Sequence, residues 1–409
     1  YDRGIPPLAS PVEVADRIEK AVRSRWPSGC DLYHIHNPLL KKNSIFLDVI
    51  KILIDRGKRV LLHVHDFAED GRPASYYRNT EYPADCHYAV INSSDYEALK
   101  ASGLTQAGLH LIPNCVRPLP IAQVAGERNT ILYPVRGIGR KNIGECLLLS
   151  LFLPDGCSLG ITLPPHSQRD RAVYENFKAA ALDLALRVQF DVGIHTPFEK
   201  LLAGTRLFIT TSVKEGFGFS FLEPWTIGAP VVGRRIDSVV GDFESNGVDL
   251  SHLYRSLYVP EGAIDRFEFA SRFRDSYNRM RTSFGLAPLD LKDADVVPGS
   301  SQGGIDFSLL DEVFQISLIR KTAQDKRLKY SFIEANPWLL DLFDSERYSD
   351  TLIEKNREAV LRVYGRESMS KILLSTYESV LSVPVKQSID KKVLLHQFLS
   401  PERFRMVVM

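Results

Sequence analysis

Two acidic side chains and two glycines form the segment of the sequence that is most suggestive of chemistry. Glu215 and Glu223 are eight residues apart, and Gly216 and Gly218 let backbone amides approach a ligand closely. The segment reads Lys214-Glu215-Gly216-Phe217-Gly218-Phe219-Ser220-Phe221-Leu222-Glu223-Pro224 and follows an apolar run. Carboxylates accept hydrogen bonds from hydroxyls, and amides at the start of a helix bind phosphates. The segment therefore predicts a site for a ligand that carries both hydroxyl and phosphate groups.

A second segment carries two cations at the end of another predicted strand. Arg136 and Lys141 are five residues apart in Tyr133-Pro134-Val135-Arg136-Gly137-Ile138-Gly139-Arg140-Lys141-Asn142. Arginine offers a planar fork and lysine a point charge, and both suit phosphate oxygens. Cations at the start of a helix oppose its dipole, so a bound anion accounts for them better than a plain basic helix start does.

Histidines alternate in two further predicted strands. The segments are His34-Ile35-His36-Asn37-Pro38 and His63-Val64-His65-Asp66-Phe67. Each His-x-His pattern places two rings on one face near the end of a strand. We interpret His34 and His63 as hydrogen-bonded core residues, because a buried histidine commonly pairs both nitrogens.

The same histidines allow a different class of function. Four imidazoles and Asp66 on neighbouring strands could bind zinc in a metal-dependent hydrolase. That hypothesis leaves the cations and carboxylates of the other two segments without a role.

The segment from Glu215 to Pro224 resembles the signature of glycosyltransferase family 4, the retaining enzymes of GT-B fold. The Arg136–Lys141 spacing is similar to the segment with which that family clamps the donor diphosphate. Val135 stands where that family usually has glycine, and Asn142 where a second glycine follows the lysine. The two histidine strands look like the family's first-domain segments, which line the acceptor side.

The resemblance implies a retaining transfer of a hexose from a nucleotide-diphosphate sugar to an acceptor hydroxyl, by front-face attack without a protein nucleophile. The implied catalytic residues are His65, Arg136, Lys141 and Glu215. The implied donor-binding residues are Arg136, Lys141, Glu215, Gly216, Phe217, Gly218 and Glu223. On the acceptor side it implies His36, Asn37 and Asp66. No cofactor and no metal is expected. A catalytically inactive sugar-binding GT-B protein is the non-enzymatic alternative.

Short β-branched runs alternate with helical patterns, which is typical of βα units with parallel sheets. The expected strands are 31–36, 59–66, 88–92, 110–113, 130–135, 159–163, 187–191, 207–211 and 230–233. The expected helices are 11–26, 43–56, 142–152, 169–184, 198–204, 219–227, 265–284, 308–324, 350–364 and 367–381. The pattern predicts an α/β protein with two doubly wound, Rossmann-like domains, which in the GT-B fold face each other across a cleft.

Domain boundaries follow from the same pattern. The pattern divides the chain at 122/123 and at 345/346. For these parts the resemblance implies an acceptor-side domain over 1–122, a nucleotide-sugar-binding domain with a helical extension over 123–345, and closing helices over 346–409 that pack back across the interface. A length of 409 residues is consistent with more than one domain.

Composition narrows the function classes. The net charge of +1 gives no global field for nucleic acid, and no apolar run is long enough to span a membrane. Five scattered cysteines without Cys-x-x-Cys spacing predict reduced thiols and a cytoplasmic location. The expected partners are a nucleotide sugar and its acceptor, and the sequence sets no oligomeric state.

Overall fold

The computed structural model describes residues 9–120, 128–292 and 304–408, which divide into two compact units. Unit 1 contains Tyr1–Cys115, Met280–Ala287 and Arg366–Arg403. Unit 2 contains Val116–Arg279, Pro288–Gly365 and Phe404–Met409. The predicted boundary between 122 and 123 lies outside the described residues, and the predicted closing segment 346–409 is divided between both units.

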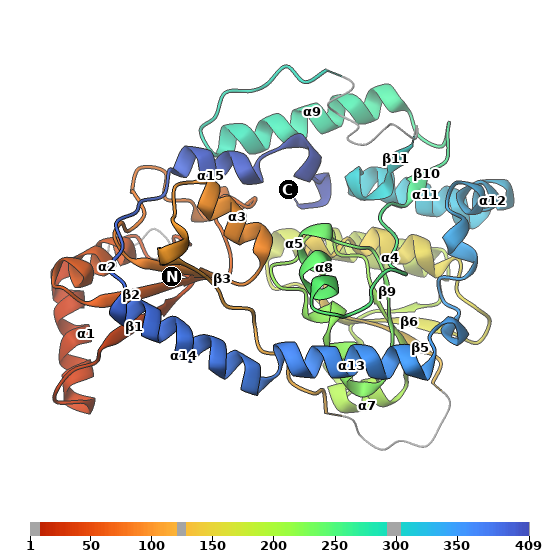
Figure 1. Cartoon of the computed structure of the whole chain (residues 1–409). Helices are drawn as coiled ribbons and strands as arrows, with labels where there is room; N and C mark the ends of the chain where they lie inside the picture. The colour runs from red at the N-terminus through yellow and green to blue at the C-terminus, as the bar shows by residue number, and fades with distance from the viewer. Residues whose placement is uncertain (1–8, 121–127, 293–303, 409) are drawn as a thin grey trace. The chain divides into compact units, whose positions relative to one another are not determined.

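Unit 1 is built on a parallel sheet with the strand order β1-β2-β3-β4 (Figure 1). The strands are β1 (Leu32–His36), β2 (Arg59–Val64), β3 (His87–Val90) and β4 (Leu109–Leu111). The helices are α1 (Pro11–Arg25), α2 (Phe46–Asp55), α3 (Ser93–Ala101), α14 (Arg366–Ser382) and α15 (Lys391–Phe398). Single 3-10 turns occur at Pro73–Ser75, Gln106–Gly108 and Pro401–Arg403.

Different helices pack on the two faces of this sheet. Leu62 and Val64 of β2 pack into a core that includes Leu47 and Ile50 of α2 and Leu394 of α15. Residues on the other face, which include Leu61 and Ala89, pack with Val380 and Tyr377 of α14. Because successive strand residues point to opposite faces, the histidines at 63 and 65 share the face that α14 covers.

Unit 2 is built on a five-stranded parallel sheet with the order β7-β6-β5-β8-β9. Its strands are β5 (Thr130–Arg136), β6 (Ser158–Leu163), β7 (Val188–Gln189), β8 (Thr205–Thr210) and β9 (Val231–Gly233). A short antiparallel pair, β10 (Tyr258–Val259) and β11 (Ile305–Asp306), lies apart from this sheet. The order places β6 and β8 on opposite sides of β5, which is the central strand.

Helices connect these strands and extend the unit. They are α4 (Ile143–Ser150), α5 (Gln168–Asp183), α6 (Val192–His195), α7 (Phe198–Ala203), α8 (Asp237–Ser245), α9 (Arg266–Ser283), α11 (Glu312–Gln324), α12 (Lys326–Ala335) and α13 (Asp350–Tyr364). Shorter 3-10 helices are η3 (Gly139–Lys141), η4 (Phe219–Phe221), η5 (Glu223–Ile227), η7 (Phe307–Leu309), η8 (Pro337–Leu340), η9 (Ser345–Arg347) and η11 (Met406–Val408). The C-terminal end of α9, from Met280, belongs to unit 1.

The predicted α/β class with two parallel sheets is confirmed, with local corrections at 219–227 and at 187–191. That predicted helix is two 3-10 helices, η4 and η5, which meet at Leu222. Pro224 cannot donate a backbone hydrogen bond, and a proline disfavours helical geometry in the residue before it. The predicted strand 187–191 is also shorter, because Asp191 has a left-handed backbone with φ of 62°.

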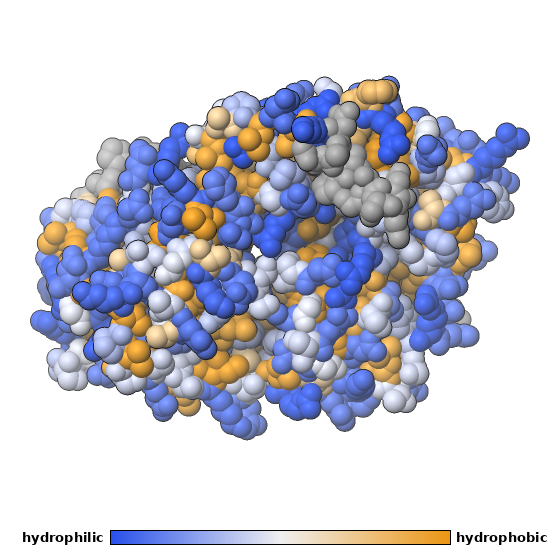
Figure 2. Space-filling view, turned by 45° about the horizontal axis from the view of Figure 1, so that its top comes forward, coloured by the Kyte–Doolittle hydropathy of each residue, from blue (hydrophilic) through white to orange (hydrophobic). Residues whose placement is uncertain are grey.

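In the described parts of the chain, none of the helices combines the length and the apolar character that crossing a bilayer requires. On the face drawn in Figure 2, hydrophilic residues cover much of the surface, and hydrophobic ones gather in small separate patches.

Candidate functional site

The carboxylate of Glu215 is held by two neighbouring cations in unit 2. Lys141 Nζ contacts Glu215 Oε1, and Arg140 donates from a guanidinium nitrogen to Glu215 Oε2 at 2.6 Å. The same Arg140 nitrogen donates to the backbone carbonyl of Lys214 at 2.9 Å. The loop after β5 is thus joined to the loop after β8, at the carboxyl ends of two adjacent parallel strands, where open α/β sheets bind ligands.

Burial strengthens the attraction between these charges and also desolvates both of them, which lowers the pKa of Lys141. The Glu215 side chain is 8% exposed and the Lys141 side chain 12%. Burial alone would raise the pKa of the Glu215 carboxyl, but the charges of Lys141 and Arg140 outweigh burial and hold that pKa below its usual value. Glu215 is therefore a carboxylate at neutral pH, with fixed acceptor oxygens.

Backbone contacts fix the two loops against each other. The hydroxyl of Tyr133 in β5 donates to the carbonyl of Lys141 at 2.8 Å and lies 2.9 Å from Ser212 Oγ. The hydroxyl of Thr211 donates to the carbonyls of Lys141 and Asn142, at 3.1 Å in each case. Because all of these groups except Lys141 are buried, the position of Lys141 is set by the ends of the strands.

Asn142 forms the turn that follows Lys141. It has a left-handed backbone, with φ of 48°, between η3 and α4. Glycine adopts this conformation most easily, and asparagine is among the few other residues that tolerate it. The side chain also donates to Glu145 Oε2 at 2.8 Å and accepts from Gln315 Nε2 at 2.9 Å.

Arg136, the other predicted clamp residue, is engaged elsewhere. Its guanidinium donates to the carbonyl of Pro164, after β6, at 2.7 Å. Lys141 instead bonds the loop after β8, on the opposite side of β5. The structure therefore brings Lys141 and Glu215 together and does not bring Arg136 into that ion pair.

Glu223 is the second acidic residue of the motif, at the start of η5. Burial raises the pKa of its carboxyl to about 7. The described residues include no hydrogen-bond or ion-pair partner for this carboxyl. It is thus a half-buried acid that titrates near neutral pH, in contrast to the paired Glu215.

The glycine turn between the two acids is shaped by packing. Gly218 has φ of 94°, and a Cβ atom there would come within 2.6 Å of Val239. The ring of Phe217 is buried and makes edge contacts with Phe243 and Tyr364. Because only a three-residue 3-10 helix follows, the turn offers backbone amides without the dipole of a long helix.

The acceptor-side residues predicted in unit 1 form one cluster. His36 Nδ1 lies 2.9 Å from His65 Nε2. Asn37 has φ of 53°, and its side-chain oxygen accepts from the backbone amides of His65 and Asp66, at 2.9 Å each. Its amide nitrogen donates to Asp66 Oδ2 at 3.2 Å. Asn37 thus fixes the turn after β2, which positions His65.

The metal-dependent hydrolase hypothesis needs Asp66 beside the histidines. Asp66 instead forms an ion pair with Arg72 at 2.7 Å and a hydrogen bond with Asn37. Its carboxylate is therefore committed to its own loop, and this hypothesis is not favoured.

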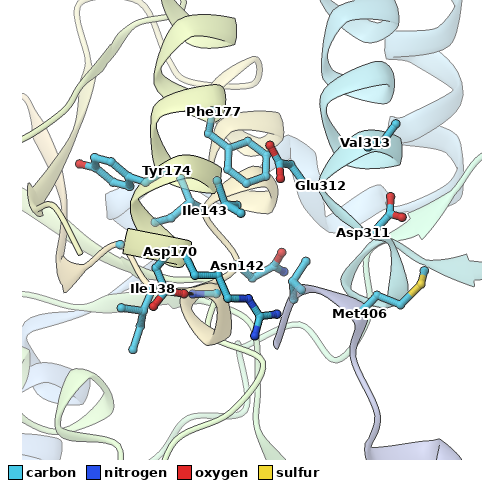
Figure 3. Close-up of a pocket in the computed structure, with 15 residues that line it drawn as sticks. Ile138, Asn142, Ile143, Asp170, Tyr174, Phe177, Asp311, Glu312, Val313 and Met406 are labelled. Carbon is cyan, nitrogen blue, oxygen red and sulfur yellow. Dashed lines mark hydrogen bonds between the residues drawn. The ribbon is translucent and has the colours of Figure 1, made fainter. Parts of the chain in front are cut away.

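A cavity of about 280 Å³ lies beside the loop after β5. Figure 3 shows Tyr174 and Phe177 of α5 on one wall, Glu312 and Val313 of α11 on another, and Met406 of η11. Its lining includes Gly137, Ile138 and Gly139 of that loop but neither Lys141 nor Glu215. The cavity is therefore next to the ion-paired residues and separate from them.

The sequence patterns did not indicate several residues that contribute to these sites. Arg140 is adjacent to Lys141 and is not part of the pattern of two cations five residues apart. Tyr133 and Tyr377 act through single hydroxyls, on Lys141 and on His34. No spacing in the sequence marks such contacts, because they join segments that meet only in the fold.

Comparisons with known proteins agree with this architecture. No family model matches the chain. Mannosylglucosyl-3-phosphoglycerate synthase of Petrotoga mobilis is 28% identical over 257 residues, which are 55% of this chain and 50% of that protein. The chain therefore matches about half the length of this curated relative.

Solved structures match over most of the chain. The protein Alr3699/HepE of Anabaena, in complex with UDP and glucose, gives a TM-score of 0.52 at 13% identity, covering 91% of this chain and 84% of that one. Sucrose-phosphate synthase of Thermosynechococcus elongatus gives 0.50 at 14% identity, covering 91% and 78%. A glycosyltransferase of Rickettsia africae gives 0.51 at 12% identity, covering 93% and 84%. With two parallel-sheet units of this topology, the chain has the GT-B fold.

Proposed function

We propose that this chain is a retaining glycosyltransferase of the family 4 type, which moves a hexose from a nucleotide-diphosphate sugar to an acceptor hydroxyl. The observation that carries the proposal is the buried Glu215 carboxylate, fixed by Lys141 and Arg140 at the carboxyl ends of β5 and β8. The likeness in fold to glycosyltransferases and the similarity to a sugar-phosphoglycerate synthase support it.

Lys141 can bind the donor diphosphate while its side chain keeps its contact with Glu215. A lysine ammonium carries three donors, and the described contacts of Lys141 use one of them, on Glu215. The other two face developing charge on the leaving phosphate, and a cation already fixed by its neighbours needs no reorganisation during the reaction. In this proposal Arg136 gives up the Pro164 carbonyl and joins Lys141 on the diphosphate.

The remaining groups have distinct roles in this proposal. Glu215 orients the hydroxyls of the donor sugar, and Glu223, with its pKa near neutrality, accepts from the ribose. The turn at Gly216–Gly218 presents backbone amides to the sugar or the phosphates. His65 contacts the transferred sugar, and the leaving phosphate takes the proton of the acceptor. No protein nucleophile, cofactor or metal takes part.

The curated relative suggests the first substrates to try. Its name includes a mannosyl group and a glucosyl-3-phosphoglycerate. We therefore propose a mannosyl nucleotide as the first donor and glucosyl-3-phosphoglycerate as the first acceptor. Other UDP-, GDP- and ADP-sugars follow, with thermal stabilisation as the measure of binding; a donor at 100 times its Kd adds roughly 2.7 kcal/mol to the free energy of unfolding.

Arg136→Ala gives the clearest test of the role of the cations. Its only described contact is with a backbone carbonyl, so the variant should fold normally. We expect turnover to fall by roughly 100-fold, the equivalent of about 3 kcal/mol of transition-state stabilisation. The matched control is Arg171→Ala, at an exposed arginine of α5, which should transfer at the wild-type rate. Full activity of Arg136→Ala would contradict the assignment.

A further inference from the structure

Four imidazoles gather on one face of the sheet in unit 1, at the ends of β1 and β2. His36 and His63 are direct partners in the parallel ladder, so their side chains point to the same face. The ring centroids of His34 and His36 are 4.2 Å apart, as are those of His63 and His65. Across the strands, His34 and His63 are separated by 5.3 Å and His36 and His63 by 5.1 Å.

The nitrogen atoms are close enough to share an ion. One ring nitrogen from each of His34, His36 and His63 lies within 4.8 Å of the other two. His34 Nε2 and His63 Nδ1 are 3.2 Å apart. Zinc bonds imidazole nitrogens at about 2.0–2.1 Å, so two ligands of a tetrahedral ion are about 3.3 Å apart. The His34 and His63 nitrogens already have the spacing of two ligands of one ion.

Groups around the cluster set the protonation of the rings. His63 Nε2 donates to the carbonyl of Ile112 at 3.2 Å, which leaves the lone pair of Nδ1 facing His34. His34 Nδ1 lies 2.8 Å from the hydroxyl of Tyr377 in α14. Burial lowers the pKa of His34 to about 4 and that of His63 to about 3, so both are neutral at pH 7, the form that binds metals.

At His34, metal binding requires an internal shift of a proton. His34 Nε2 now donates to His63 Nδ1, and Nδ1 accepts from Tyr377. If Nε2 binds an ion, the proton moves to Nδ1 and is donated to the Tyr377 oxygen. This outer hydrogen bond is the kind that orients metal-bound imidazoles. His36 is the exposed member and provides the path from solvent.

We propose that His34, His36 and His63 form a site for a divalent metal that prefers imidazole, with Zn²⁺ as the ion. The site shares His36 with the acceptor-side residues implied by the resemblance and adjoins His65. The proposed sugar transfer itself assigns no role to His34 or His63 and uses no metal. Asp66, which is held by Arg72 and Asn37, is not part of it.

The test uses the 409-residue chain after treatment with a chelator and dialysis. Titration calorimetry with Zn²⁺ should show one equivalent bound, and Co²⁺ should give the visible absorption of a four-coordinate site. His36→Ala removes an exposed ligand without opening the core, and we expect it to weaken Zn²⁺ binding at least 30-fold. Tyr377→Phe removes the outer partner of His34 and should weaken it by about 10-fold.

The matched control is His396→Ala, at an exposed histidine of α15 in the same unit. It should bind Zn²⁺ as the wild type does. The proposal is overturned if the wild type binds no Zn²⁺, or if His36→Ala binds it as tightly as the wild type. Circular dichroism of each variant shows that a lost signal does not come from unfolding.

Discussion

At the scale of single residues, the ion pair of Lys141 and Glu215 combines a structural with a chemical role. Replacing Lys141 by Met leaves a carboxylate that is 8% exposed with Arg140 as its described ionic partner. Removing one partner of a buried pair typically costs about 3–5 kcal/mol when the other charge is left uncompensated, and the remaining contact with Arg140 reduces that cost here. We therefore expect Lys141→Met to lower both turnover and the free energy of unfolding, measured by urea denaturation.

The double variant Lys141→Met with Glu215→Gln separates these two effects. It removes both charges, so the free energy of unfolding should recover by more than half of the single-variant loss. Turnover should not recover, because the cation is still absent. A double variant that regains activity along with stability would show that Lys141 serves the fold alone.

Residue types explain which of these positions the sequence could predict. Glu215 and Lys141 belong to short motifs whose charges stand out against an apolar strand, and the structure brings them together. The hydrogen bond of Arg136 to the carbonyl of Pro164 could not be predicted, because every residue has a backbone carbonyl and the sequence does not mark which one is bound. Arg140 is visible only once the loops after β5 and β8 are placed side by side.

At the scale of elements, the loop after β5 depends on a segment from the C-terminal end of the chain. A Cβ atom on Gly139 would come within 2.2 Å of the carbonyl of Val407 in η11. Backbone atoms cannot yield as a flexible side chain does, so Gly139→Ala should displace η11 or the loop. We expect a clear fall in Tm, measured by differential scanning calorimetry.

A truncation of residues 407–409 identifies the cause of that fall. Without η11 the added methyl group meets no carbonyl, so Gly139→Ala should then cost much less than it does in the full chain. Gly241→Ala is the matched control, because a Cβ atom there meets nothing within 4 Å. In the interior of α8 it should leave Tm unchanged or raise it. Equal losses with and without residues 407–409 would rule out this contact.

Elements were predicted well where periodicity is strong and poorly where a single residue interrupts it. Helix α13 has the predicted bounds, and the core strands of both sheets lie where apolar runs indicate. The helix predicted over 219–227 failed because Pro224 outweighs the apolar spacing around it. The contact of η11 with Gly139 joins positions more than 260 residues apart, and no local pattern reports it.

At the scale of the whole molecule, each unit combines segments from distant parts of the chain. Unit 1 takes its sheet from the first 115 residues and covers one face of it with α14, whose residues begin at 366. Membership of a unit depends on these long-range contacts, so it could not be predicted from local composition. The division into two sheets could be predicted from the sequence, because it follows from the alternation of strands and helices.

The end of α14 contacts this sheet through neutral histidines. Lowering the pH therefore tests whether these contacts hold α14 on the sheet. His87 Nε2 donates to the carbonyl of Val383, just after α14, at 2.9 Å, and its Nδ1 lies 2.9 Å from His110 Nε2. Because the carbonyl can only accept, His87 Nδ1 accepts from His110. Burial, and then the charge of His87, lower the pKa of His110 to about 4, and burial lowers that of His87.

The sign of the pH dependence follows from these directions. The unfolded chain binds protons at His87 and His110 below about pH 6.5, whereas the native state takes up its proton at His110 only near pH 4. Stability should therefore be full above pH 6.5 and fall between pH 6.5 and 4, by at most about 1.4 kcal/mol per pH unit for each imidazole; partial exposure of His110 reduces this.

His110→Gln keeps a donor for His87 but cannot titrate. Urea midpoints of the wild type and this variant, measured from pH 7.5 to 4.5 with a chelator present, should diverge as the pH falls, the variant losing less stability. Parallel curves would mean that protonation of this pair does not loosen α14 from the sheet, and that the acid sensitivity of the protein arises elsewhere.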